Sequence, residues 1–185
     1  MKEIELSRYI SYILRHNPSS INATLDNQGW CDVEELITGV NKFSKFNLDF
    51  QLLNKIVKED VKIRYSFNSD FTKIRANQGH SLKNVNLGLK EVTPKTNLYH
   101  GTSSRFIKSI LESGLLKRTR QYVHLTDNFN TALTVGKRHG GTTIILSVNV
   151  EAALKDGFKF YLSDNNVYLS DDVPVKYLKI ENEKE

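Results

Sequence analysis

The sequence lacks the residues and motifs that would place it in several common classes of protein. Its single cysteine, Cys31, excludes an internal disulfide framework and a cysteine-based zinc site. We expect Cys31 to be a small buried apolar residue rather than a nucleophile. There is no P-loop, no G-x-S-x-G, no Rossmann G-x-G-x-x-G and no H-E-x-x-H. These absences argue against the mechanisms that depend on those motifs, and we expect no bound metal.

Long apolar segments are also missing. The N-terminal stretch MKEIELSRY has no continuous apolar region, so it does not resemble a signal peptide. No apolar run approaches the roughly 20 residues that are needed to span a bilayer. We therefore expect a cytoplasmic protein without membrane association. The formal net charge of +5 is compatible with a polyanionic partner but does not identify one.

The composition is that of a globular protein with a sizeable core. Hydrophobic residues make up 39% of the chain and charged residues 25%. Nine Phe, eight Tyr and one Trp supply much of the apolar volume. A chain of 185 residues allows one large domain or two small ones.

The first part of the chain predicts three helices. Apolar residues recur at helical spacing near the N-terminus, and Pro18 should end this helix near His16. Asp32 and Glu35 resemble a capping box at the start of a second helix. Asp49 can cap a third helix with one apolar side.

A β-hairpin is expected after the helices. Residues 63–67 alternate between apolar and polar, which predicts a strand with Arg64 on its polar face. A turn cluster at 68–70 and a second strand over 71–76 follow. Three helices followed by a hairpin is the order of a winged helix. That fold often handles nucleic acid, but the fold alone does not establish the function.

The second half is expected to form a separate domain. Residues 83–96 contain few large apolar groups and are expected to link a domain of residues 1–82 to one of residues 97–185. The second domain is predicted to be mainly β, with two helices over 105–113 and 130–137, so the fold class is α+β. Gly114 suits the left-handed residue that follows a helix. The expected strands cover residues 97–100, 122–125, 143–150, 158–161, 167–169 and 177–180.

Several cationic residues of the first domain could bind a phosphate. Arg15 and His16 end the first helix, although a simple cationic helix cap explains them as well. Arg64, two residues after Lys62, is by itself better explained as a residue on a solvated sheet face. The segment Arg75–Ser81 gathers guanidinium, amide, imidazole and hydroxyl donors around Gly79 and could grip phosphate and sugar oxygens. A polar loop without a ligand is the alternative.

The second domain carries a different set of candidates. His100 is expected at a strand end, beside Gly101, where a backbone can approach a ligand closely, and Thr102 adds a hydroxyl. His124 lies within a predicted strand. Arg120 ends a basic cluster, and its planar fork suits oxyanions. Structural histidines and a solvated basic cluster are the competing interpretations.

Nine short motifs follow one another along nearly the whole chain. They are LSRYISYILRH (6–16), DNQGW (26–30), KIRY (62–65), IRANQGHS (74–81), LYHGT (98–102), SGL (113–115), VHL (123–125), DG (156–157) and NVYL (166–169). In their order and spacing they resemble the RNA 2′-phosphotransferases of the KptA type. This resemblance implies a winged-helix RNA-binding lobe over residues 1–82 and an ADP-ribosyltransferase-like, NAD-binding lobe over residues 97–185.

The resemblance also implies a reaction. An internal RNA 2′-phosphate, of the kind left at a tRNA splice junction, attacks NAD and nicotinamide leaves. The ADP-ribosylated intermediate then resolves to RNA with a free 2′-hydroxyl and ADP-ribose 1″,2″-cyclic phosphate. NAD is a co-substrate, the other partner is a tRNA-like 2′-phosphorylated RNA, and we expect a monomer.

The roles implied by the family fall into three sets. The catalytic residues are Arg15, His16, Arg64 and Arg120. The NAD-binding residues are His100, Gly101, Thr102, Gly114, Leu115, His124 and Val167, of which His100, His124 and Val167 form the transferase triad. The residues expected to bind RNA or phosphate are Lys62, Arg75, Gln78, His80 and Ser81.

One residue departs from the family pattern, and two rival functions are open. Family members often carry histidine where this chain has Tyr122, which puts in doubt any role assigned to that position. The first rival is an ADP-ribosyltransferase that leaves ADP-ribose on a nucleic-acid phosphate. The second is a nucleic-acid-binding protein without catalysis, which would not need both His100 and His124.

Overall fold

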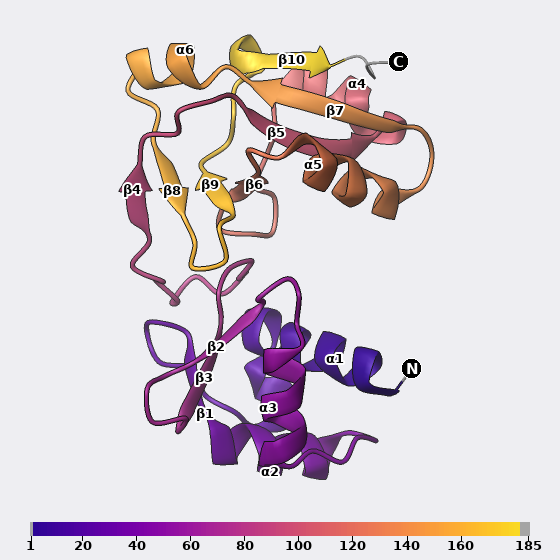
Figure 1. Ribbon diagram of the computed structural model, residues 1–185, viewed down its shortest axis with the longest axis vertical. Helices are drawn as coiled ribbons and strands as arrows, with labels where there is room; N and C mark the ends of the chain where they lie inside the picture. Colours follow the sequence, from indigo (N-terminus) through magenta and orange to yellow (C-terminus); the bar gives the residue numbers. More distant parts are fainter. Residues whose placement is uncertain (1, 182–185) are drawn as a thin grey trace. The chain divides into compact units, whose positions relative to one another are not determined.

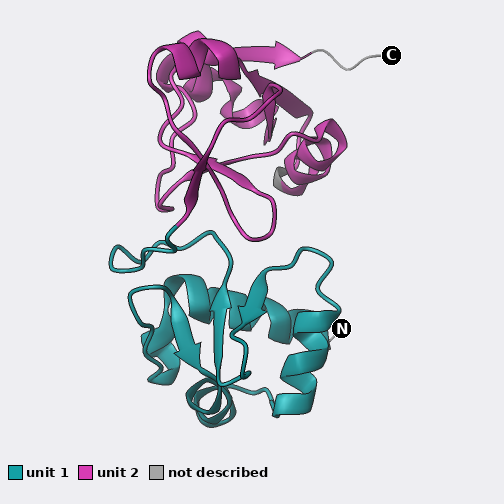
Figure 2. Cartoon of the chain, turned by 60° about the vertical axis from the view of Figure 1, so that its left-hand side comes forward, with its two compact units in different colours: residues 1–88 teal, residues 89–185 magenta. Residues whose placement is uncertain are grey.

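The computed structural model describes residues 2–181 and divides the chain into two compact units (Figure 1). Unit 1 comprises residues 1–88 and unit 2 residues 89–185, coloured separately in Figure 2. Residue 1 and residues 182–185, the outer ends of the two predicted domains, lie outside the described residues. The division falls within the segment 83–96 that the sequence predicts as a connector.

The three predicted helices of unit 1 are confirmed. They are α1 (Lys2–His16), α2 (Val33–Phe43) and α3 (Phe50–Lys58), and a short 3₁₀ turn, η1 (Pro18–Ile21), follows α1. Asp32 and Asp49 act as N-caps, because their carboxylates accept hydrogen bonds from the backbone N–H groups of Glu35 and Leu52.

The core of unit 1 lies between these helices and a small sheet. Helix α1 contributes its apolar stripe, each side chain of which adds roughly 2 kcal/mol when fully buried. Cys31 is fully buried, and this burial raises the pKa of its thiol to about 12. A thiol with that pKa stays protonated and inert, as the sequence predicts. The stripe consists of Leu6, Ile10, Ile13 and Leu14.

The sheet of unit 1 is antiparallel in the order β1-β3-β2. Its strands are β1 (Trp30–Asp32), β2 (Tyr65–Phe67) and β3 (Lys73–Ala76). The hairpin of β2 and β3 was predicted, but β1, which pairs with β3 from Trp30↔Arg75 to Asp32↔Lys73, was not. A strand of three residues that ends on the helix cap Asp32 is too short to show an alternating pattern.

The prediction that Arg64 lies within a strand is wrong. Strand β2 begins at Tyr65, and Ile63 before it is 54% exposed with a φ of 45°. The carboxylate of Asp60 accepts hydrogen bonds from the backbone N–H groups of Lys62 and Arg64. These bonds fold residues 60–64 into a turn, which overrides the alternation of apolar and polar residues.

Unit 2 contains two antiparallel sheets, and helices α4 and α5 pack on the first of them. The first has the order β10-β7-β5 and the second β4-β8-β9-β6. Together with unit 1 this makes an α+β protein, and no helix in residues 2–181 is long and apolar enough to cross a membrane. The elements of unit 2 are β4 (Lys90–Val92), β5 (Leu98–Ser103), α4 (Ser104–Ser113), β6 (Val123–Leu125), α5 (Phe129–Gly136), η2 (Lys137–His139), β7 (Thr143–Val148), α6 (Val150–Lys155), β8 (Phe160–Leu162), β9 (Tyr168–Ser170), η3 (Val175–Tyr177) and β10 (Leu178–Glu181).

Several details of unit 2 differ from the sequence-based expectation. Strand β4 lies inside the predicted connector and pairs with β8. Helix α6 was missed: Asn149 caps it, so the strand predicted to run to Val150 ends at Val148. Strand β5 continues through His100 to Ser103 rather than ending at His100, because its pairing with β7 persists over six residues.

Glycine permits the close packing of helix α5 on strand β5. A Cβ atom at Gly101 would overlap the carbonyl oxygen of Ala132 in α5, and one at Gly136 would overlap the methyl group of Thr143. The two backbones therefore meet at a distance that a side chain would prevent. Strands β5 and β6 are in turn joined by a two-bond bridge between Tyr99 and Thr126.

We predict that Gly101→Ala lowers the free energy of unfolding of unit 2 by about 3 kcal/mol, because the new methyl group must displace helix α5. Denaturant unfolding of the full chain measures this. Gly157→Ala is the matched control: it has no atom within 4 Å and only the strain of a φ of 79°, which costs about 1 kcal/mol. Equal losses in the two variants would contradict this account of the packing.

Candidate functional site

The end of helix α1 is attached to the segment Gly79–Ser81. The backbone N–H of Ser81 donates to the carbonyl oxygen of Arg15 at 3.0 Å, and the Ser81 hydroxyl bonds Nδ1 of His16 at 3.0 Å. Gly79, with a φ of 89°, lies against the guanidinium of Arg15, whose carbon is 3.5 Å from the position of a Cβ atom. Four of the predicted site residues are thus neighbours in unit 1: Arg15, His16, His80 and Ser81.

His80 is the buried centre of this group. It is 1% exposed, and neither of its ring nitrogens has a hydrogen-bond partner among the described residues. Burial lowers its pKa to about 4, and the positive charges of Arg15, His16 and Arg75 add to this effect. His80 is therefore neutral near pH 7, while cationic side chains gather around it.

The other predicted RNA-binding residues lie along the same stretch of unit 1. The guanidinium of Arg75 stacks 4.5 Å from the ring centre of Trp30, its partner in the neighbouring strand. Gln78 is half-buried and Lys62 is exposed. Direct contact of these side chains with RNA stays a prediction.

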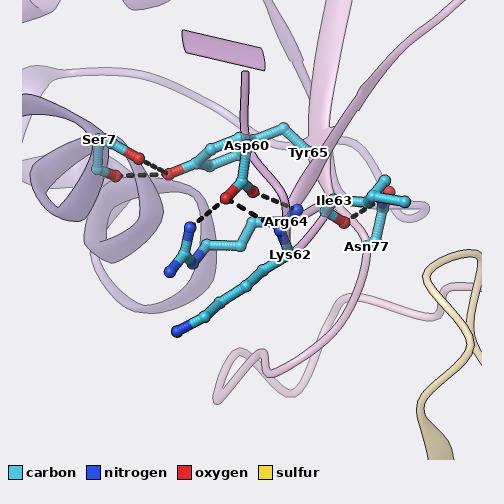
Figure 3. Close-up of polar contacts among 7 residues, drawn as sticks. All are labelled: Ser7, Asp60, Lys62, Ile63, Arg64, Tyr65 and Asn77. Atoms are coloured by element: carbon cyan, nitrogen blue, oxygen red, sulfur yellow. Dashed lines mark hydrogen bonds and ion pairs between the residues drawn. The ribbon is translucent and has the colours of Figure 1, made fainter. Parts of the chain in front are cut away.

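Arg64 is held by Asp60 in a turn just before strand β2 (Figure 3). The side chain of Asp60 is 6% exposed, and its carboxylate accepts from both the guanidinium and the backbone of Arg64. Asn77 closes the turn by donating to the carbonyl oxygen of Ile63 at 2.8 Å. The turn, rather than a strand, therefore sets the direction of the Arg64 side chain.

Tyr65 brings the two arginines of unit 1 into one electrostatic environment. Its hydroxyl donates to the backbone carbonyl of Ser7 in α1 (Figure 3). Burial raises the pKa of Tyr65, while the positive charges of Arg64 and Arg15 act in the opposite direction. Arg15 and Arg64 thus both add positive charge to the surroundings of this phenol. Together with His16 beside Arg15 in the sequence, they give unit 1 a cationic region, which attracts an anionic group.

In unit 2, two histidines are fixed in opposite tautomers. Nδ1 of His100 lies 3.0 Å from the backbone carbonyl oxygen of His124. A carbonyl only accepts, so His100 carries a proton on Nδ1. The guanidinium of Arg120 lies 3.4 Å from Nδ1 of His124. A guanidinium only donates, so this bond requires the proton of His124 to be on Nε2. In a neutral His100 ring Nε2 is then an acceptor, whereas Nε2 of His124 carries a proton.

Arg120 and Tyr122 flank His124 on the preceding segment. Arg120 is an exposed residue, yet partial burial of its guanidinium lowers its pKa from the usual arginine value. It remains charged near neutral pH because arginine titrates far above that range. Tyr122 packs against Tyr161 with 5.7 Å between ring centres, and burial raises the pKa of its phenol. Tyr122 therefore stays neutral where a histidine would titrate.

The remaining predicted NAD-binding residues have mainly backbone roles in unit 2. Gly101 faces helix α5, so that helix fills the space expected for a ligand, and Thr102 is 4% exposed within β5. Leu115 exchanges two backbone hydrogen bonds with Val173. A Cβ at Gly114, whose φ is 82°, would overlap the Val173 carbonyl. Contact of these residues with NAD stays a prediction.

Val167 lies in the turn just before strand β9. The hydroxyl of Ser163 bonds both its N–H and its carbonyl, at 3.1 and 3.0 Å. The side chain is half-buried. The strand predicted to begin at Val167 begins at Tyr168, and the Ser163 bonds supply the reason, because they close a turn at this point.

Sequence reasoning missed the residues that support the site. Asp60, Trp30 and Tyr161 contact Arg64, Arg75 and Tyr122. An aspartate four residues before an arginine gives a weak signal, but the two aromatic contacts join distant segments and give none. In residues 2–181 no group of three or more His, Cys, Asp or Glu side chains is arranged to hold a metal ion.

We predict that acid destabilises the protein through His80. Its pKa is about 4 in the folded chain against 6.5 for an ordinary histidine, so the unfolded chain binds the proton first as the pH falls. The free energy of unfolding should drop by about 2 kcal/mol between pH 7 and pH 5 from this group alone. Urea unfolding across this range checks it, with His80→Gln as the comparison. An identical pH slope in the two proteins would refute the assignment.

Comparison with known proteins gives a match over most of the chain. The profile of the family described as "RNA 2'-phosphotransferase, Tpt1 / KptA family" matches residues 1–172. A relative from Fusobacterium nucleatum, named "Probable RNA 2'-phosphotransferase", is 50% identical over 177 residues, covering 96% of this chain and 98% of the relative. Relatives of the same name from Flavobacterium johnsoniae and Agrobacterium fabrum are 47% and 45% identical, covering 96% and 94% of this chain and 96% and 92% of the relatives.

Proposed function

Because this chain belongs to the RNA 2′-phosphotransferase, Tpt1 / KptA family, we propose that it removes an internal 2′-phosphate from RNA by transferring it to NAD. The observation that carries the proposal is the cationic region of unit 1: Arg15 and Arg64 both act on Tyr65, and the segment Gly79–Ser81 contacts Arg15 and His16. A tRNA-like RNA with a splice-junction 2′-phosphate is the substrate class that fits this chemistry.

Each unit has an architecture suited to its proposed partner. We assign unit 1 to the winged-helix class, on the order of three helices followed by a β-hairpin and on its three-stranded antiparallel sheet. We assign unit 2 to the ADP-ribosyltransferase class, on its two small antiparallel sheets and on the paired His100 and His124. Unit 1 would bind the RNA and unit 2 the NAD.

The first step forms a bond between RNA and ADP-ribose. An oxygen of the RNA 2′-phosphate attacks C1″ of the nicotinamide ribose, and the bond to nicotinamide breaks, with the electron pair leaving on nicotinamide. The donor Nε2 of His124 and the acceptor Nε2 of His100 suit ribose hydroxyls, which both donate and accept. Val167 would pack against the cofactor. We further propose Gly101, Thr102, Gly114 and Leu115 as the frame of the NAD pocket.

The second step releases the phosphate from RNA. The 2″-hydroxyl attacks phosphorus, the bond from phosphorus to the RNA 2′-oxygen breaks, and that oxygen takes up a proton. The products are RNA with a 2′-hydroxyl and ADP-ribose 1″,2″-cyclic phosphate. The phosphate stays anionic throughout, so fixed guanidinium groups can neutralise its developing charge without exchanging protons. Arg15, Arg64 and Arg120 would do this, with His16 donating to a phosphate oxygen.

A product analysis distinguishes the proposal from its two rivals. The full chain is incubated with an oligonucleotide carrying one internal 2′-phosphate, with and without NAD. We expect NAD-dependent formation of 2′-hydroxyl RNA and the cyclic phosphate. Loss of phosphate without NAD would overturn the mechanism. A stable ADP-ribosylated RNA would favour an ADP-ribosyltransferase that stops after the first step. Binding without reaction would favour a non-catalytic nucleic-acid-binding protein.

We predict that Arg120→Ala slows the second step more than the first, by roughly a hundredfold, because one charged contact to the phosphate is lost. Single-turnover analysis should then show accumulated ADP-ribosylated RNA. Arg118→Asn is the matched control: it removes a charge from the same basic cluster, and asparagine tolerates the φ of 53° at that position. Unchanged turnover in Arg120→Ala, without accumulated intermediate, would contradict the assignment.

A further inference from the structure

We propose that Ser81 is a positioning residue for His16, and that Gly79–Ser81 acts as a clamp on the end of helix α1. The sequence predicts a direct contact between Ser81 and RNA, whereas in the structure the Ser81 hydroxyl bonds the ring of His16. This inference rests on the proposed function, because a positioned His16 matters for phosphate transfer only if that transfer occurs.

The clamp begins with the backbone. The last carbonyl groups of an α-helix have no partner within the helix. The carbonyl of Arg15 accepts from the N–H of Ser81, a residue 66 positions later in the sequence, at 3.0 Å. Gly79 has a φ of 89° and no side chain, which leaves its face open to the Arg15 guanidinium. The segment thus holds the end of the helix through backbone contacts that do not depend on the Ser81 hydroxyl.

The ring of His16 is then held between two groups. The Ser81 hydroxyl bonds Nδ1 at 3.0 Å, and the Tyr12 ring lies 5.9 Å from the imidazole ring, centre to centre. Asn17 donates to the Tyr12 hydroxyl at 3.4 Å, which ties Tyr12 to the same helix end. His16 is exposed, and an exposed side chain without such contacts changes rotamer within nanoseconds. The contacts with Ser81 and Tyr12 therefore restrict the direction of the exposed His16 ring.

A hydroxyl is well suited to this position because it can both donate and accept. When His16 is neutral, Ser81 can donate to Nδ1, so that the ring proton lies on Nε2. When His16 is protonated, Ser81 can accept from Nδ1–H, and Nε2 again carries a proton. With these roles of Ser81, Nε2 carries an N–H in both states and can donate to a phosphate oxygen. An amide or carboxylate at position 81 would favour only one orientation or one charge state.

The buried neighbour His80 adds no positive charge to the clamp near pH 7. Its buried ring is neutral at that pH, whereas a further positive charge there would repel Arg15 and His16. The simpler alternative is that the bond between Ser81 and His16 only anchors a polar loop. Removing the hydroxyl would then lower stability without a specific effect on the chemical step.

The test compares three variants of the full chain in single-turnover assays with the 2′-phosphorylated oligonucleotide and NAD. We expect Ser81→Ala to lower the maximal rate 10- to 100-fold with little change in the RNA concentration for half-maximal rate, as is typical of residues that orient a reacting group. Ser81→Thr keeps the hydroxyl and should retain most of the rate. Ser69→Ala, at an exposed turn of the same unit, is the matched control and should behave as the parent.

A double-mutant cycle isolates the action through His16. In a His16→Ala background, Ser81→Ala should have no further effect on the rate, because the group that it positions is gone. Additive losses would overturn the proposal. A rise in the half-maximal RNA concentration with an unchanged maximal rate would also overturn it, by showing that Ser81 binds RNA directly. So would rate losses in Ser81→Ala and Ser81→Thr that follow a shared loss of stability.

Side-chain relaxation of the His16 ring, measured by NMR on the protein without RNA or NAD, separates the two proposals. We expect a rigid ring in the parent chain and a mobile ring in Ser81→Ala. A mobile ring in both, or a rigid ring in both, would refute the clamp whether or not the chain is an enzyme. A clamp that is present in a chain unable to transfer phosphate would instead refute the proposed function.

Discussion

The site in unit 1 depends on holding like charges together before any anion binds. Arg15, His16 and Arg75 all act on the pKa of His80, and Arg15 and Arg64 act on that of Tyr65. Mutual repulsion would separate such groups on flexible side chains. The buried carboxylate of Asp60 offsets the charge of Arg64, and Gly79–Ser81 holds Arg15 and His16 through packing and hydrogen bonds. An anion that enters this region meets groups already in place, so little free energy is spent on reorganisation.

In unit 2 the main requirement is different: two histidine rings, His100 and His124, are held in defined orientations. Backbone contacts supply most of these restraints. The bridge between Tyr99 and Thr126 joins β5 to β6, and one bond from His100 to the carbonyl of His124 then defines a tautomer. Close packing at Gly101 keeps β5 in place against α5. Arg120 defines the tautomer of His124, which makes it a support for the proposed NAD site as well as a proposed catalytic residue.

Local signals in the sequence were sufficient for the helices and for most strands. Caps at Asp32 and Asp49, and a proline after His16, act within a few residues, so their effect can be recognised without knowledge of the fold. Arg64 shows where this fails. The alternation around it predicts a strand, but two backbone bonds to the Asp60 carboxylate produce a turn. Strands β1 and β4 have three residues each, and only pairing with a partner strand defines them.

The sequence by itself determined the family, the fold class and the identity of the candidate residues, because these follow from motifs whose order and spacing are linear properties of the chain. Only the tertiary structure decided how those residues are held. It showed that Ser81 bonds His16 across 65 positions, that Asp60 directs Arg64, and that helix α5 occupies the space beside Gly101. Such contacts join segments brought together by burial of separate apolar faces, and the physical driving force for that burial is not directional. Hydrogen-bond geometry supplies the direction, and it exists only after the chain has folded.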